Sequence, residues 1–354
     1  YWGLSKESGL LGGIVFILNG YMQELNNLEY ILWAASWLPY IFLYVNKLYD
    51  QQKFKNFIFL ILFSSLQLAT GRFDFFYFTF IFVSIWLLYR FFREKKFSIN
   101  INELKKILFI ISAFGFSVLL LSIQVFPVLE FIKTTVRSAG LTLKEATEWP
   151  LYPLQLAQLL FSNFFGDLYS GDGIYSLLNK KNNISFLIYN LYLGFSVFSL
   201  IILAIFNRLK YSGFLLFTII LFSLISLGDN TPLFSFFFNV VPNFNLSRFP
   251  IKLFIFPIFC FSLLSALGLE SLKQNENHRV FLRILLFNLF IISLLFMMVE
   301  INYKSLVEKL NLILIFKINS LDFMIKSILY SLFFTILFLL YFYYFSGTLL
   351  SLPE

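Results

Sequence analysis

Long apolar segments recur along the whole chain, and short polar segments separate them. A helix that crosses a membrane needs about 20 mostly apolar residues, and ten segments of the chain fit this pattern, a few of them short. They are 8–23, 28–46, 56–71, 73–91, 107–129, 184–206, 212–227, 250–271, 280–299 and 326–347. The pattern predicts an all-α, polytopic membrane protein with about ten transmembrane helices, forming a single transmembrane domain over residues 1–354.

Lysine and arginine residues gather in the connections on one side of the predicted membrane. If all ten segments cross, each basic cluster falls on that same side. The clusters are Lys47, Lys53 and Lys55; Arg90, Arg93, Lys95, Lys96, Lys105 and Lys106; Arg208 and Lys210; and Lys273, Arg279 and Arg283. Because short cytoplasmic loops carry an excess of Lys and Arg, we expect both ends of this chain in the cytoplasm.

The opposite, outer face has two tight loops, at 24–27 and near 72, and three longer ones in which we expect interfacial amphipathic helices. The long loops cover 130–183, 228–249 and 300–325. In 153–165 two glutamines and a serine fall on one helical face among apolar residues, as in a helix that lies along a membrane. Thr231 and Pro232 suit the N-cap and first position of a short apolar helix over 233–241. The stretch 304–317 mixes lysines with Leu and Ile. The alternative is that these helices only seal the loops onto the bundle.

Composition agrees with a membrane protein and excludes several soluble classes. Hydrophobic residues make up 59% of the 354 positions and charged residues 13%, against about a quarter charged in soluble domains. The apolar excess extends along the whole chain, which excludes a single anchor with a soluble head. The net charge of +8 comes mostly from the predicted cytoplasmic loops, so nucleic acid is not an expected partner.

Single cysteine and histidine residues limit the chemistry of the chain. Cys260 is the only cysteine and His278 the only histidine. An internal disulfide is therefore impossible, and neither a histidine-based metal site nor a Ser-His-Asp triad is expected. No cofactor is evident. Asp167 and Asp172, five residues apart around a Gly-containing turn, could bind a divalent cation, although the spacing matches no strong metal motif.

Charged residues avoid the centres of the predicted spans and gather at the outer face. Intramembrane charges mark ion pathways, so their scarcity argues against an ion-coupled transporter. The outer set could instead bind a lipid-linked phosphate, because Arg and Lys recognise phosphate and a carboxylate can accept a proton. The expected substrate-binding residues are Arg248, Lys252, Arg72, Glu130, Arg137 and Asp229, and Asp74 is the catalytic candidate within the chain. The alternative is that basic residues near span ends snorkel and pair with loop acids.

Two local arrangements within this set make specific predictions. Arg248 precedes Phe249 and Pro250, so the chain should enter the eighth span rigidly. Lys252 follows four residues later and shares a helical face with Arg248 if the helix begins at Arg248. Asp74 and its neighbour Arg72 could equally form a local pair that holds the turn between two spans.

A series of different short motifs lies between residues 25 and 270. They are LNNL at 25–28 and ASWLP at 35–39; QLATGR at 67–72, with Asp74 close behind; QVFPVLE at 124–130, followed by Arg137; Trp149 to Pro153 and NFFG at 163–166; YLG at 192–194; LGDNTPL at 227–233; Val241 and Pro242; SRFPIK at 247–252; and LGLE at 267–270. In order and spacing this set resembles the YfhO-like bacterial membrane proteins of the GT-C glycosyltransferase superfamily.

The resemblance implies an enzyme of the bacterial cytoplasmic membrane. Such an enzyme would move a sugar, with inversion, from a polyprenyl-phosphate-linked donor to a lipid, glycan or polymer of the cell envelope at the extracytoplasmic face. It implies that Arg248 and Lys252 face the donor phosphate, and that the key acidic residue of the family precedes Tyr1. A lipid or polysaccharide flippase and an envelope polysaccharide polymerase or ligase are the alternatives.

Overall fold

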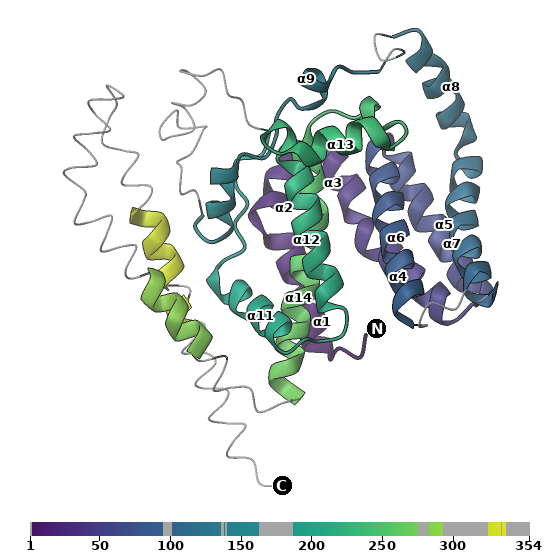
Figure 1. Ribbon diagram of the computed structural model, residues 1–354. Coiled ribbons are helices and arrows are strands. Elements are labelled where there is room, and N and C mark those ends of the chain that lie inside the picture. Colours follow the sequence, from purple (N-terminus) through teal and green to yellow (C-terminus); the bar gives the residue numbers. More distant parts are fainter. Residues whose placement is uncertain are drawn as a thin grey trace, which may run out of the picture. The chain divides into compact units, whose positions relative to one another are not determined.

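The computed structural model describes residues 2–94, 101–135, 138, 140–162, 187–274, 281, 283–292, 325–333 and 335–337. Within these ranges every regular element is a helix (Figure 1). The chain divides into two compact units. Unit 1 combines Leu25–Glu148 with Leu221–Phe259, and unit 2 combines Trp2–Glu24, Trp149–Ile220 and Cys260–Glu354.

Unit 1 contains most of the long helices. They are α3 (Glu29–Ser36), α4 (Leu38–Asp50), α5 (Phe54–Ala69), α6 (Phe73–Glu94), α7 (Ile101–Leu120) and α8 (Ser122–Lys133). Its other elements are η1 (Leu25–Asn27), α9 (Leu143–Ala146), η4 (Gly228–Asn230), α13 (Pro232–Val240), η5 (Phe244–Leu246) and η6 (Pro250–Phe254). Two helices, α12 (Ser212–Ser226) and α14 (Ile255–Gln274), have residues in both units.

Helix α5 packs along α7 and α4 in unit 1, and these helices lie side by side with α6 (Figure 1). Polar side chains between them find partners: the hydroxyls of Ser64 and Ser117 lie 2.6 Å apart, and the Gln67 amide donates to the Ala34 carbonyl over 2.9 Å. Around them the core is aromatic, with Phe42 packed against both Phe82 and Trp86. Because buried polar groups cost stability unless they are hydrogen-bonded, these contacts fix the register of neighbouring helices.

Unit 2 is held together by close helix packing and by polar contacts between distant parts of the sequence. It contains α1 (Lys6–Leu18), α2 (Gly20–Glu24), η3 (Pro153–Leu159) and α11 (Phe195–Phe206). Gly268 of α14 lies directly against the backbone of Leu200 in α11. At the start of α1, the Ser5 amide donates to Glu270 over 2.7 Å, and Lys273 forms an ion pair with Glu7 over 2.7 Å. These contacts join the start of α1 to the end of α14.

Some of the helices are long and apolar enough to cross a membrane. Among the described residues these are Phe73–Arg93 and Pro250–Lys273. A third is added if α7 and α8, which bend by 79° at Leu121, form one span. The all-α prediction is therefore confirmed for the described part of the chain, with two or three helices that could span a membrane.

Three of the predicted segments consist of two helices instead of one, and one of them is 107–129, which includes the bend between α7 and α8. Segment 8–23 breaks at Asn19, whose side chain donates to the carbonyl of Phe16 and accepts from the amide of Met22. Segment 28–46 breaks between α3 and α4, where Pro39 stands in the first turn of α4. A proline has no N–H for the preceding turn, so it suits a new helix start better than a continuous helix.

The predicted helices of the outer loops have different outcomes. The prediction for 153–165 is wrong in its described part, because Pro153–Leu159 is a 3-10 helix and its glutamines are buried; Gln155 donates to the Ile188 carbonyl over 2.9 Å, and residues 163–165 lie outside the described residues. A helix is confirmed at α13 with Pro232 in the first turn, and its position along a membrane stays a prediction; the Thr231 hydroxyl donates to the Leu224 carbonyl instead of capping the helix. The stretch 304–317 lies outside the described residues.

Candidate functional site

A pocket of about 770 Å³ in unit 1 brings several of the predicted residues together. Three segments form its walls: the turn into α6, the helix α8, and the chain from Asn243 to Lys252. The lining residues are Gly71, Arg72, Phe73, Asp74, Tyr77, Val125, Val128, Leu129, Phe131, Ile132, Thr135, Asn243, Leu246, Ser247, Arg248, Phe249 and Lys252. The pocket therefore combines a charged side with an apolar side.

The turn between α5 and α6 places Arg72 and Asp74 at the pocket. Gly71 has a φ of 76°, a left-handed conformation that glycine adopts without a steric penalty. The Arg72 amide then donates to the Thr70 hydroxyl over 3.4 Å, and the Phe75 amide donates to Asp74 over 3.1 Å. A carboxylate in the first turn of a helix is also favoured by the helix dipole.

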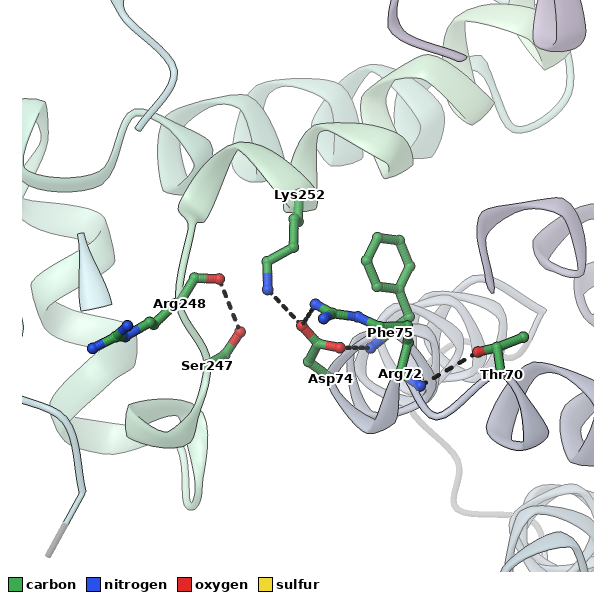
Figure 2. A network of polar contacts seen from close by, with 7 residues as sticks. All are labelled: Thr70, Arg72, Asp74, Phe75, Ser247, Arg248 and Lys252. Carbon is green, nitrogen blue, oxygen red and sulfur yellow. Dashed lines mark hydrogen bonds and ion pairs between the residues drawn. The ribbon is translucent and has the colours of Figure 1, made fainter. Parts of the chain in front are cut away.

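Asp74 is the centre of a network of three charged side chains (Figure 2). Its Oδ2 atom lies 2.5 Å from Nη2 of Arg72 and 2.5 Å from Nζ of Lys252. The side chain of Lys252 is only 3% exposed and that of Asp74 17%. The interpretation of Arg72 and Asp74 as a local pair is therefore confirmed, and the pair extends to a lysine 178 positions away. A carboxylate held by two cations is a weak base, so this geometry suits a structural role for Asp74 better than proton abstraction.

The side chains of Arg248 and Lys252 point in different directions (Figure 2). The prediction that they share a helical face is wrong, because the helix begins at Pro250 and Phe249 adopts a left-handed φ of 68°. This residue turns the chain between the two cations. Both side chains nevertheless line the same pocket.

Two arginine nitrogens in the pocket have no hydrogen-bond partner among the described residues. They are the Nε atoms of Arg72 and Arg248, and both are buried. An orphaned buried donor usually marks a site that a ligand or water can satisfy. The charged lining residues are three cations and one carboxylate, which gives the described lining a net charge of +2. An anionic ligand is the chemical complement of this wall.

The chain around Arg248 is fixed by contacts that the sequence pattern did not reveal. Tyr77 donates to the Pro242 carbonyl over 2.5 Å, and the Leu141 amide donates to the Asn245 carbonyl over 3.0 Å. Asn243 has a left-handed φ of 61°, a conformation that asparagine tolerates better than most residues. An Asn between Pro242 and the SRFP motif is the one local signal that could have indicated this turn.

Helix α9 lies beside η5 and brings an acid near Arg248. Thr142 donates to Glu145 through its hydroxyl (2.7 Å) and its amide (2.8 Å), which closes a capping box. These hydrogen bonds hold the pKa of Glu145 below its usual range, and the charge of Arg248 lowers the pKa further. Glu145 is therefore an anion near Arg248 at neutral pH.

Two other predicted site residues that the structure describes do not line this pocket. Glu130 is exposed on α8, and Asp229 is exposed in η4. Arg137, Asp167 and Asp172 lie outside the described residues. Within the described ranges, no group of three or more His, Cys, Asp or Glu side chains could hold a metal ion.

No known protein family, curated protein or solved structure matches the chain.

Proposed function

We propose that this protein is a membrane glycosyltransferase of the YfhO-like, GT-C type. It would move a sugar from a polyprenyl-phosphate-linked donor to a lipid, glycan or polymer of the cell envelope at the extracytoplasmic face of a bacterial cytoplasmic membrane. The observation that carries this proposal is the pocket of unit 1, in which three cations face an apolar wall. A lipid phosphate has the same two parts, an anionic head and an apolar chain.

The charged side of the pocket suits a phosphate in a specific way. Arg248 presents a planar guanidinium whose Nε has no hydrogen-bond partner among the described residues, and guanidinium groups bind phosphate through two parallel hydrogen bonds. Arg72 has a similarly orphaned Nε. Asp74 would hold Arg72 and Lys252 in position through its two ion pairs.

The apolar side of the pocket suits the isoprenoid part of the donor. Val125, Val128, Leu129 and Ile132 of α8 line it together with Phe249. Burial of apolar surface contributes about 25 cal/mol per Å², so these contacts would add affinity for the lipid without selecting among sugars. In the same proposal, about ten segments cross the membrane and both ends of the chain lie in the cytoplasm, which puts the pocket on the outer side.

Replacing Arg248 tests the proposed phosphate contact. We expect Arg248→Ala to weaken binding of a polyprenyl phosphate by about 2 kcal/mol, roughly 30-fold in affinity, because a charge-assisted bidentate contact is lost. Binding can be measured by native mass spectrometry of the chain in nanodiscs. Transfer of a radiolabelled sugar by the protein in proteoliposomes then tests whether the bound lipid is a donor.

Lys144→Ala is the matched control, because Lys144 is an exposed cation of the neighbouring α9 that does not line the pocket. It should bind the lipid phosphate as the parent does. Equal affinities for the parent and Arg248→Ala would refute the phosphate site. Binding without sugar transfer, accompanied by movement of the lipid across the bilayer, would favour a flippase.

A further inference from the structure

Helix α8 combines three features that differ from those of an ordinary span. It follows α7 after a bend of 79° at Leu121. Only Val125 of its twelve residues is buried. Its large apolar side chains Ile123, Phe126 and Phe131 are 85%, 66% and 67% exposed.

Helix α7 already has the length of a membrane crossing. Its 20 residues rise by about 30 Å, which matches the thickness of the hydrocarbon core. Lys105 and Lys106 in its first turns can extend toward the headgroups. If α7 stands across the membrane, a bend of 79° leaves α8 nearly parallel to the membrane plane.

The exposed face of α8 has the composition of a membrane interface. Ile123, Phe126, Glu130 and Thr134 recur at spacings of three and four residues, so they lie on one side of the helix. Exposed apolar side chains of this size avoid water, whereas Glu130 and the exposed Lys133 would be costly in the hydrocarbon core. Only the headgroup boundary accommodates both kinds of side chain.

The opposite face of α8 belongs to the pocket. Val128 and Ile132 line it, next to the buried Val125. We infer that α8 is an interfacial helix that rests in the headgroup region of the bilayer, with Ile123 and Phe126 in contact with lipid and with Phe131, which is exposed and also lines the pocket, between the two faces. The helix is then the wall that separates the pocket from the surrounding membrane. This inference concerns the contact with lipid and does not depend on sugar transfer.

Spin-label depth measurements test this placement. Cys260, the only cysteine, is buried, and a Cys260→Ala background allows one nitroxide at a time at Ile123→Cys or Phe131→Cys. In proteoliposomes, accessibility to oxygen relative to a water-soluble nickel chelate reports depth. We expect the two labels to lie within a few ångströms of each other, at headgroup level. A helix that continued the span would separate them by about 12 Å in depth.

Two further spin labels serve as references for depth in the bilayer. Phe116→Cys on the exposed side of α7 should be deeper than both α8 labels, and Lys53→Cys in the exposed connection before α5 should be aqueous. A 12 Å difference between the α8 labels, or purely aqueous values for both, would overturn the inference. If one variant does not give a monodisperse protein, Phe126→Cys and Thr134→Cys provide the same eight-residue comparison.

Discussion

Asp74→Asn is expected to destabilise the protein by about 3 kcal/mol, because the substitution removes the carboxylate that Arg72 and Lys252 share. The amide keeps the shape of the side chain but carries no charge. Lys252 is almost completely buried, so its ammonium group would lose the anion that offsets its desolvation. The loss should be visible as a lower midpoint of thermal unfolding of the full chain in detergent.

A second substitution separates a structural role of Asp74 from a catalytic one. In Asp74→Asn with Lys252→Met, the buried charge is removed together with its partner, and part of the lost stability should return. Asp229→Asn is the matched control, because Asp229 is exposed and outside the pocket, and its midpoint should equal that of the parent. An unchanged midpoint in Asp74→Asn, together with complete loss of sugar transfer, would instead identify Asp74 as the catalytic base.

Gly268→Ala should have an effect of similar size for a different reason. A Cβ atom at this position would lie 2.1 Å from the carbonyl oxygen of Leu200 and 2.7 Å from its carbonyl carbon. Backbone atoms cannot move aside as a flexible side chain can, so α14 and α11 would have to separate. Overpacking of this kind costs about 3 kcal/mol, which exceeds the gain of about 1 kcal/mol from replacing a helical glycine.

Gly115→Ala is the control for Gly268→Ala. Gly115 also lies inside a helix, α7, but a Cβ there would meet no atom within 4 Å. This variant should unfold at the temperature of the parent or slightly above it, while Gly268→Ala unfolds well below. Equal midpoints for the two variants would show that the contact between α14 and α11 does not contribute to stability.

The helical class of the protein was predictable, whereas several helix ends were not. Apolar runs with few charges have no alternative to helices in a chain of this composition, which is why that prediction holds throughout the described ranges. The break at Asn19 depends on a side chain that replaces main-chain hydrogen bonds. The bend at Leu121 has no local signal in the sequence. The helix break at Asn19 and the bend at Leu121 could therefore not be predicted from the continuous apolar pattern.

Arg72, Asp74, Arg248 and Lys252 of the predicted set line the candidate pocket, whereas Glu130 and Asp229 do not, and the geometry of the pocket was not predictable. Arg72 and Asp74 are neighbours in sequence, so their pairing followed from proximity. The contact between Asp74 and Lys252 joins positions 178 apart, and no local pattern encodes such a contact. The direction of Arg248 depended on the backbone of Phe249, because a non-glycine residue with positive φ is rare enough that a helical start was the reasonable expectation.

The left-handed turn at Phe249 separates Lys252, which has a structural role, from Arg248, the proposed binding residue. A mutation can therefore change one of them without changing the other. A regular helix would have coupled Arg248 and Lys252, so that a shift of either would move the other along the same face. With the turn between them, Lys252 is fixed to Asp74 in the interior, while Arg248 extends in another direction. In the proposed site, changes at Arg248 should therefore alter anion binding and leave the ion pair between Lys252 and Asp74 intact.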